Sequence, residues 1–132
     1  DTLFIAGCGR FFEGTGRDMD MALNQIMLRA VGETNWNKVK IYPGHEYTKG
    51  NVSFIRAKIY SDIGQNKEFD ALEQYCKSNE CTTGHFTLRD ELGYNPFMRL
   101  DDRAVRLAVG DTAGTYPRSV VMQELRKLKN AM

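Results

Sequence analysis

Only two short segments of this chain have the apolar pattern of a buried β-strand, and both lie within the first 42 residues. One is the run Leu3–Ala6, which ends at the glycines of Gly7–Gly9, and the other is Val39–Tyr42, which ends at Pro43. We predict that each is a short strand followed by a tight loop. Two strands make a poor sheet. The pattern therefore predicts part of an α/β layer, with the rest of its sheet lying outside these 132 residues.

Between these two strands, the apolar residues recur at helical spacing. Gly32 stands where such a helix should stop, because glycine suits the left-handed conformation that follows many helices. The predicted apolar face consists of Met19, Ala22, Leu23, Ile26, Met27 and Ala30.

The chain after His45 is predicted to be helical. Val52, Ile55 and Ile59 fit the face of one helix, and Phe69, Leu72 and Cys76 fit the face of a second. A third is indicated by a possible capping box, Thr87-x-x-Asp90. A fourth spans Asp102–Val109, and the last begins at about Pro117, which suits a first-turn position. The inward residues of the last helix are predicted to be Val121, Leu125 and Leu128.

Charge and cysteine content exclude several classes of function. The 18 Lys and Arg residues nearly balance the 17 Asp and Glu residues, which gives a formal net charge of +1. Such a chain has no bulk attraction for nucleic acid or anionic lipid, so we expect no nucleic-acid partner. No apolar run approaches the ~18 residues of a membrane span, so we expect no membrane partner either. The three cysteines form no CxxC pair and favour a reducing compartment.

Three segments resemble glyoxalase II, the hydroxyacylglutathione hydrolase family of the metallo-β-lactamase superfamily. They are Asp1–Thr15 (DTLFIAGCGRFFEGT), Tyr42–Thr48 (YPGHEYT) and Asn95–Arg99 (NPFMR), and a basic C-terminal helix follows in the same order. The similarity is to the fungal forms. It implies the C-terminal part of an αββα sandwich over residues 1–46 and a helical glutathione-binding domain over residues 47–132, an α/β plus α fold class. Asp1 already lies within a strand-like pattern, so we expect an N-terminal half of the same protein to precede it.

The resemblance implies a binuclear metal site, for which zinc is expected and iron or manganese are alternatives. Asp1 matches the carboxylate that bridges the two metals, and His45 matches a terminal ligand. The family's Thr-His-x-His-x-Asp-His motif does not occur in this sequence. The chain by itself is therefore expected to lack most of the metal ligands and to be inactive. Taken without the resemblance, Asp1 also fits a solvated terminal residue and His45 a surface loop.

The resemblance also implies that Arg10, Phe12 and Tyr47 contact glutathione. Related enzymes often carry Lys and Tyr at the positions of Arg10 and Phe12. Arg126 and Lys129 match an Arg and a Lys that hold a substrate carboxylate, and their spacing predicts one shared helical face, away from the apolar residues. Core packing of the aromatic side chains, and stabilisation of the helix dipole by the cations, are the alternative interpretations.

The implied reaction is hydrolysis of S-D-lactoylglutathione to glutathione and D-lactate, a step of methylglyoxal detoxification, in the cytoplasm or the mitochondrial matrix. A persulfide dioxygenase of the same superfamily is an alternative, because it shares a Gly-Cys-Gly-Arg loop with residues 7–10. A non-catalytic glutathione-binding piece is another. The position of Cys8 between two glycines suggests a nucleophile, but we expect no catalytic cysteine. We expect His85 to be a loop residue.

Overall fold

The opening segment folds back on itself as a hairpin. In the computed structural model, which describes residues 1–132, β1 (Leu3–Phe4) pairs antiparallel with β2 (Gly7–Cys8), with Leu3 opposite Cys8 and Phe4 opposite Gly7. Ile5 and Ala6 form the turn, and Ala6 has a positive φ of 59°. The prediction of one strand over Leu3–Ala6 was therefore wrong in its second half. The segment is buried as expected, but two of its four residues reverse the chain direction.

The predicted strand at residues 39–42 is extended, but it does not join the hairpin. Lys40 forms a single antiparallel bridge with Thr87, and the backbone N–H of Ile41 donates to the carbonyl of Phe86 at 3.0 Å. The prediction of a second strand in the same sheet was wrong. The extended pattern was recognised correctly, but its partner is a loop more than forty residues further along the chain.

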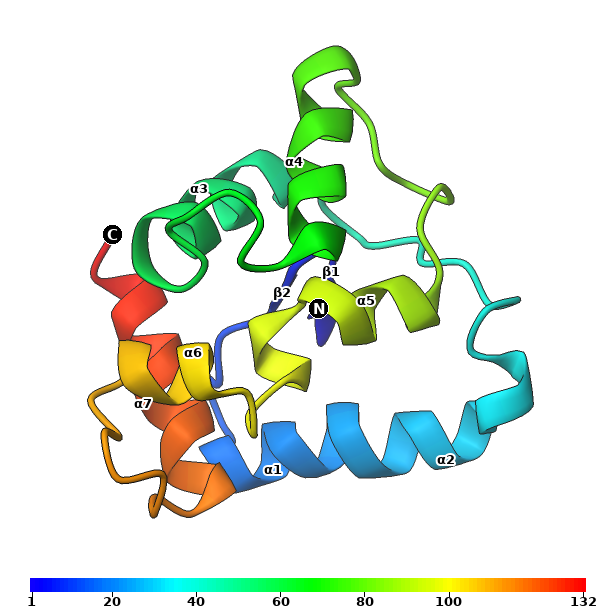
Figure 1. Ribbon diagram of the computed structural model, residues 1–132. Helices are drawn as coiled ribbons and strands as arrows, with labels where there is room; N and C mark the ends of the chain where they lie inside the picture. The colour runs from blue at the N-terminus through cyan, green and yellow to red at the C-terminus, as the bar shows by residue number, and fades with distance from the viewer.

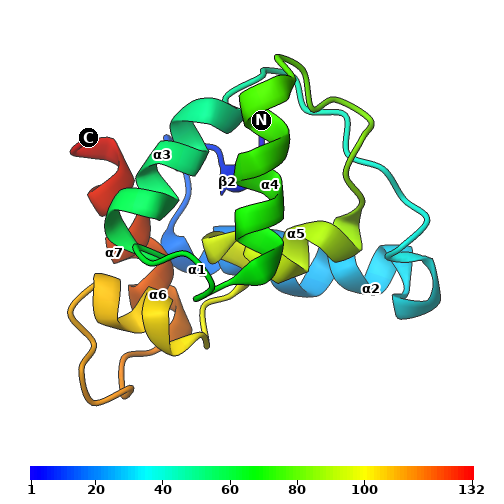
Figure 2. The same cartoon turned by 45° about the horizontal axis from the view of Figure 1, so that its top comes forward.

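Helices form the rest of the molecule, and Figures 1 and 2 show the first of them as one long rod along one side. None of the helices combines the length and the apolar character that crossing a bilayer requires. The elements are α1 (Gly16–Met21), the π-helical η1 (Ala22–Met27), α2 (Leu28–Val31), the 3₁₀ turn η2 (Glu33–Asn35), α3 (Thr48–Lys58), α4 (Lys67–Ser78), α5 (Leu88–Tyr94), the 3₁₀ turn η3 (Pro96–Met98), α6 (Arg103–Ala108) and α7 (Arg118–Asn130).

Local start and stop signals in the sequence were largely correct. The capping box is present: Asp90 N–H donates to Thr87 Oγ1 at 3.2 Å, and Thr87 N–H donates to Asp90 Oδ2 at 2.9 Å. Gly32 ends α2 with a φ of 83°, a conformation that glycine adopts without steric cost. Pro117 is the N-cap of α7, one residue before the first-turn position that we predicted for it.

The π-helical segment changes the buried face of the rod. Leu23 is fully buried and Met27 packs partly against the core, whereas the side chain of Ile26 is 62% exposed. In a π-helix the backbone hydrogen bonds join residues i and i+5, which widens the turn. Residues four to five positions apart then lie on one face, whereas in an α-helix the spacing is three to four. The prediction that Ile26 belongs to the apolar face was therefore wrong.

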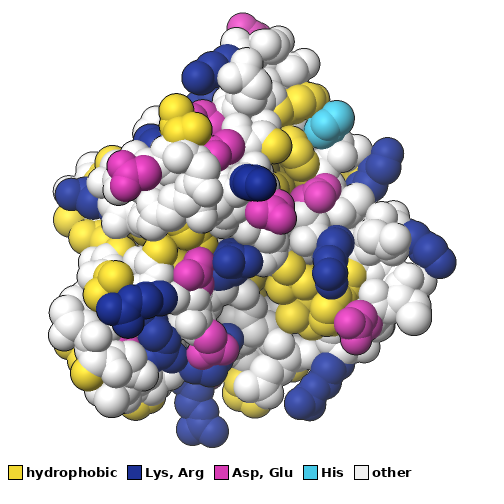
Figure 3. Space-filling model, viewed as in Figure 1, with side chains coloured by type: hydrophobic (Ala, Val, Ile, Leu, Met, Phe, Trp, Pro, Cys, Tyr) yellow, Lys and Arg dark blue, Asp and Glu magenta, His cyan; other side chains and the backbone are white.

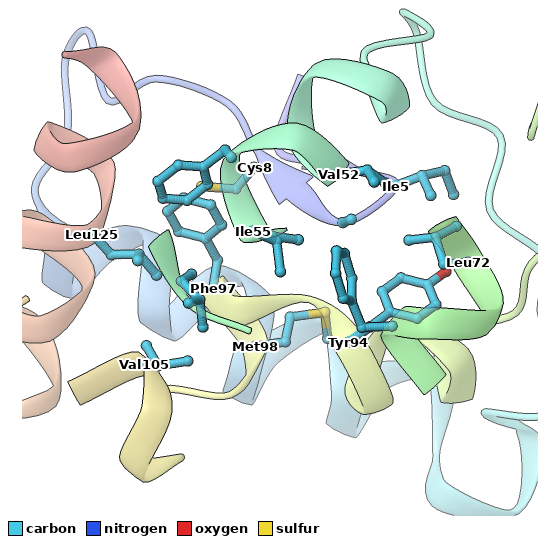
Figure 4. Close-up of a cluster of buried hydrophobic side chains, with 14 of the residues drawn as sticks. Ile5, Cys8, Val52, Ile55, Leu72, Tyr94, Phe97, Met98, Val105 and Leu125 are labelled. Atoms are coloured by element: carbon cyan, nitrogen blue, oxygen red, sulfur yellow. The ribbon is translucent and has the colours of Figure 1, made fainter. Parts of the chain in front are cut away.

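One core joins the hairpin to the helices (Figure 4). It contains 22 buried residues, and it continues across residue 46, where the first predicted domain ends. Ile5, Cys8, Leu23 and Ile41 come from the first region. Full burial of each large aliphatic or aromatic side chain contributes ~1.5–3 kcal/mol, so packing across this boundary is a main source of stability. The position of the domain boundary itself stays a prediction.

Two arginine side chains link pairs of helices through salt bridges. Arg56 on α3 contacts Asp70 at 2.8 Å and Glu73 at 2.9 Å, both on α4. Arg118 on α7 contacts Asp20 on α1 at 3.0 Å. Over the face drawn in Figure 3, cations and carboxylates are interspersed, and hydrophobic atoms reach the surface in separate patches.

One carboxyl group lies wholly inside the core. Glu91 on α5 is fully buried. Its oxygens accept hydrogen bonds from the hydroxyl of Tyr94 at 3.1 Å and from the backbone N–H of Ala6 at 3.0 Å. A buried carboxyl group is tolerated only when such partners replace water.

Helix α1 approaches α7 so closely that a methyl group at Gly16 should destabilise the fold. A Cβ there would lie 2.5 Å from the carbonyl oxygen of Ser119 and 3.0 Å from the backbone nitrogen of Gln123. We expect Gly16→Ala to lower the free energy of unfolding by about 1–3 kcal/mol. The matched control is Gly50→Ala on α3, where a Cβ meets nothing within 4 Å. It should stabilise by about 0.5–1 kcal/mol. Denaturant unfolding of both variants checks this, and equal effects would contradict it.

Glu91→Gln should change how stability depends on pH. Burial raises the pKa of Glu91 to about 8, although hydrogen bonds from Ala6, Asn95 and Tyr94 act in the opposite direction. The unfolded chain loses this proton near pH 4.5. Between these values the folded state binds more protons, so stability falls as the pH rises, by at most ~1.4 kcal/mol per pH unit. Glutamine does not titrate. Relative to the variant, the wild type should therefore lose stability between about pH 5 and about pH 8, and a constant difference in unfolding free energy would refute this.

Candidate functional site

The open end of the hairpin lies against one cavity of about 810 Å³. The N-terminal turn of α3, the loop after α4 and the last turns of α7 complete its wall. Six of the seven predicted site residues line this cavity, namely Asp1, Arg10, Phe12, Tyr47, Arg126 and Lys129. The seventh, His45, lies beside Asp1 and Tyr47. The structure therefore gathers residues from both ends of the chain, while their roles stay predictions.

Asp1 and His45 face each other at the edge of this cavity. Oδ2 of Asp1 and Nε2 of His45 are 3.7 Å apart, and the two side chains are 60% and 53% exposed. The ring of His45 stacks on Tyr47 with centroids 5.1 Å apart, and Phe4 meets the Tyr47 ring edge-on at 5.0 Å. This row of rings holds the imidazole beside the carboxylate.

Gly9 leaves the room that Asp1 needs. A Cβ at Gly9 would lie 1.9 Å from the backbone carbonyl oxygen of Asp1, so no other residue fits there without moving the strand. The N–H of Gly9 also donates to the carbonyl of Thr2 at 3.1 Å. Gly9 therefore lets the residues before β1 lie directly beside the end of the second strand.

The donor atoms of Asp1 and His45 fit one divalent metal ion. Protein nitrogen and oxygen ligands bind zinc at about 2.0–2.2 Å, so an ion can contact two atoms that are 3.7 Å apart. No group of three or more His, Cys, Asp or Glu side chains in the chain is placed to hold a metal. Asp1 and His45 thus form only part of such a site, since a catalytic zinc takes about three protein ligands.

Lys49 and three further cations line the cavity, and the three lie close enough to act on one another without forming an ion pair. Arg10, Arg126 and Lys129 all line it, and none has a carboxylate partner within 4.0 Å. Partial burial lowers the pKa of Lys129, and the positive charges of Arg126 and Arg10 lower it further. Unpaired like charges held together are costly unless an anion joins them, so this cluster is suited to a ligand carboxylate.

The position of Arg126 differs from the prediction. We expected it to point away from the apolar face of α7, but it is only 9% exposed. Its Nη1 donates to the carbonyl of Cys8 at 2.7 Å, and its Nε donates to Oδ1 of Asn130 at 2.9 Å. The guanidinium also lies over the Phe97 ring, 5.8 Å from its centroid. Because Arg126 reaches from α7 to the carbonyl of Cys8 in the hairpin, the buried face of α7 is wider than the apolar stripe indicates.

The two predicted aromatic site residues are exposed, whereas Cys8 is buried. Phe12 is 86% exposed and Tyr47 is also exposed, so neither side chain belongs to the core. Burial raises the pKa of the Cys8 thiol to about 12, although Arg126 acts in the opposite direction. A thiol that stays protonated is a poor nucleophile, which agrees with our expectation that Cys8 is not catalytic.

Glu46 is a site residue to which the sequence reasoning gave no role. Its carboxylate accepts hydrogen bonds from the hydroxyls of Thr48 and Thr82 and from the backbone N–H of Thr82. Although burial opposes it, these bonds hold the pKa of Glu46 below its usual range. They tie the segment after His45 to the loop after α4. Only its place next to His45 could have drawn attention to it.

Comparison with known proteins finds relatives along the length of this chain. A family model described as the C-terminus of hydroxyacylglutathione hydrolase matches residues 46–132. The chain is 57% identical over 132 residues to the cytoplasmic isozyme of hydroxyacylglutathione hydrolase from Saccharomyces cerevisiae, which covers 100% of the chain and 48% of that relative. It is 46% identical over 131 residues to a probable hydroxyacylglutathione hydrolase of Schizosaccharomyces pombe, covering 99% of the chain and 46% of the relative.

The chain thus spans about half the length of the curated relatives it matches. The first of these alignments covers the whole chain, including the hairpin, the segment around His45 and the basic end of α7. The chain belongs to the hydroxyacylglutathione hydrolase family.

Proposed function

We propose that the intact protein hydrolyses glutathione thioesters, with S-D-lactoylglutathione as its substrate and glutathione and D-lactate as its products. The observation that carries this proposal is the convergence of Arg10, Arg126 and Lys129 beside Asp1 and His45. The names of the relatives support the same class of reaction. We propose the cytoplasm or the mitochondrial matrix as the compartment, and the relative named a cytoplasmic isozyme favours the first.

Binding of the peptide part of the substrate depends on the three cations. Glutathione carries two carboxylates, and a hydrogen bond between ions is about twice as strong as a neutral one. Arg126 uses one Nη1 N–H for the Cys8 carbonyl and its Nε N–H for Asn130, so three of its five N–H donors remain for a ligand. Lys129 and Arg10 keep all their donors. The exposed Tyr47 and Phe12 offer a hydroxyl group and an apolar surface.

Asp1 and His45 would hold a metal ion in the intact protein, and zinc is the metal we propose. Bound there, such an ion supplies a Lewis acid that polarises the thioester carbonyl and lowers the pKa of water. The stack of His45 on Tyr47 fixes the plane of the imidazole, so that Nε2 stays directed toward Asp1. The leaving thiol has a pKa near ~8.5, so it departs as a thiolate without an acid.

The test of this function compares two thioesters with the intact protein. S-D-lactoylglutathione should be hydrolysed in a reaction that a chelator abolishes and added metal restores. The lactoyl thioester of N-acetylcysteamine presents the same acyl group without carboxylates. Its kcat/KM should be at least about 10-fold lower, because the charge-assisted contacts are lost. Equal values for both thioesters would show that the cations do not recognise the thiol part.

Changing His45 to Ala should collapse turnover in the intact protein. Loss of a metal ligand should lower kcat by more than the 10–100-fold typical of residues that merely support ligands. His85→Ala is the matched control, because this second histidine stacks on Tyr75 at 4.1 Å and does not line the cavity. Measuring the metal content and kcat of both variants tests whether His45 is a metal ligand. A His45→Ala protein with wild-type kcat would remove His45 from the site.

Lys129 and Arg126 should respond differently to replacement by Ala. Lys129→Ala should raise KM by about 10-fold or more with kcat nearly unchanged, if the contact is equally strong in ground and transition states. The control Lys127→Ala removes an exposed cation that pairs with Glu124 at 3.2 Å, and KM should stay the same. Arg126→Ala should also cost about 1–3 kcal/mol of stability, because the Cys8 carbonyl loses its donor. Kinetics and thermal unfolding of the three variants measure this. An unchanged KM in Lys129→Ala would leave Lys129 as a helix-end charge only.

A further inference from the structure

Three buried polar side chains from the helices hold the backbone of the hairpin turn. Glu91 accepts from the N–H of Ala6 at 3.0 Å. Nδ2 of Asn95 donates to the carbonyl of Gly7 at 3.1 Å, and Nδ2 of Asn51 donates to the carbonyl of Ile5 at 3.0 Å. We call Asn51, Glu91 and Asn95 the clamp.

The clamp is one connected network inside the core. Glu91 and Asn95 are fully buried, and Asn51 is buried as well. Nδ2 of Asn95 also donates to Glu91 at 3.2 Å, while Oδ1 of Asn95 accepts from the N–H of Phe97 at 3.0 Å. Asn95 is therefore fixed in orientation, since turning its amide over would break all of these bonds.

The hairpin needs this support because its own ladder is too short. It has two residues per strand, and even a full two-stranded hairpin is marginally stable in water. Its turn lies in the clamp, and its open end carries Asp1 before one strand and Arg10 beyond the other. A shift of the turn would therefore move both residues relative to His45 and Lys129, which other segments hold.

We propose that Glu91, acting with Asn95 and Asn51, is a positioning residue for the reaction: it fixes the hairpin so that Asp1 meets His45 and Arg10 faces the substrate cavity. This proposal rests on the proposed function. Glu91 touches neither substrate nor metal in this role. It acts through the Ala6 N–H, and its carboxyl group is retained in the core despite the cost of burying it.

Three variants of the intact enzyme separate positioning from stability. Glu91→Leu fills the space but leaves the Ala6 N–H without an acceptor. Tyr94→Phe is the matched control, because it removes a different hydrogen bond from the same carboxyl group and leaves Ala6 bonded. Glu91→Gln is the rescue, since its amide oxygen still accepts from Ala6.

The measurements are zinc affinity by competition with a chelator, kcat and KM, all made at a temperature at which each variant is folded. Glu91→Leu should lower zinc affinity and kcat by about 10–100-fold, the usual cost of losing a residue that orients a metal ligand. Tyr94→Phe should stay within about 3-fold of the wild type although its melting temperature falls, and Glu91→Gln should restore most of the loss.

Wild-type zinc affinity and kcat in Glu91→Leu would overturn the proposal, as would an equal loss in Tyr94→Phe. If Glu91→Leu does not fold, Asn51→Leu provides the test. Because Asn51 also lines the cavity, zinc affinity is the deciding quantity for this variant, and it should fall. If the wild type hydrolyses no glutathione thioester, the proposed function fails. The Asp1–His45 separation in crystal structures of wild type and variant would then still decide whether the clamp positions the hairpin.

Discussion

The hydrogen bond from the Ala6 N–H to the buried carboxyl group of Glu91 is the interaction on which the rest of the site depends. A turn whose backbone groups are removed from water needs partners, and a ladder of two residue pairs supplies too few. Glu91 provides a partner from α5, more than eighty residues away in the sequence. With it in place, the hairpin becomes part of the helical core, and its open end has a defined position beside the cavity.

The cavity combines two kinds of chemistry because two kinds of segment meet there. The hairpin and the segment around His45 bring oxygen and nitrogen donors suited to a divalent metal, with Asp1 and His45 3.7 Å apart. The last turns of α7 bring cations that have no carboxylate partner. Arg126 belongs to both parts, because it supports the Cys8 carbonyl at 2.7 Å and keeps one edge of its guanidinium toward the cavity. Structural and binding roles are therefore not separable at this residue.

The predictions were wrong where a segment had the expected local pattern but the fold gave its side chains other surroundings. The extended segment at residues 39–42 was recognised, but Lys40 bridges to Thr87 and not to the hairpin. Ile26 fitted an α-helical face, yet the π-helical turn moves it into solvent. Arg126 fitted a polar face, yet α7 buries it against the hairpin and Phe97. Apolar periodicity reports one face of one element and carries no information about which partner covers it.

The sequence by itself determined the approximate helices, the capping box at Thr87, the glycine at residue 32 and, through the resemblance of three short segments, the family and seven candidate site residues. These are local properties, because a cap or a helix end depends only on residues that are neighbours in the sequence. Only the tertiary structure decided that six of the seven line one cavity, that Arg126 is a buried support, and that Glu91 and two asparagines hold the hairpin. The reason is physical: a buried polar group is stable only next to its partner, and for Glu91 that partner lies 85 residues away in the chain.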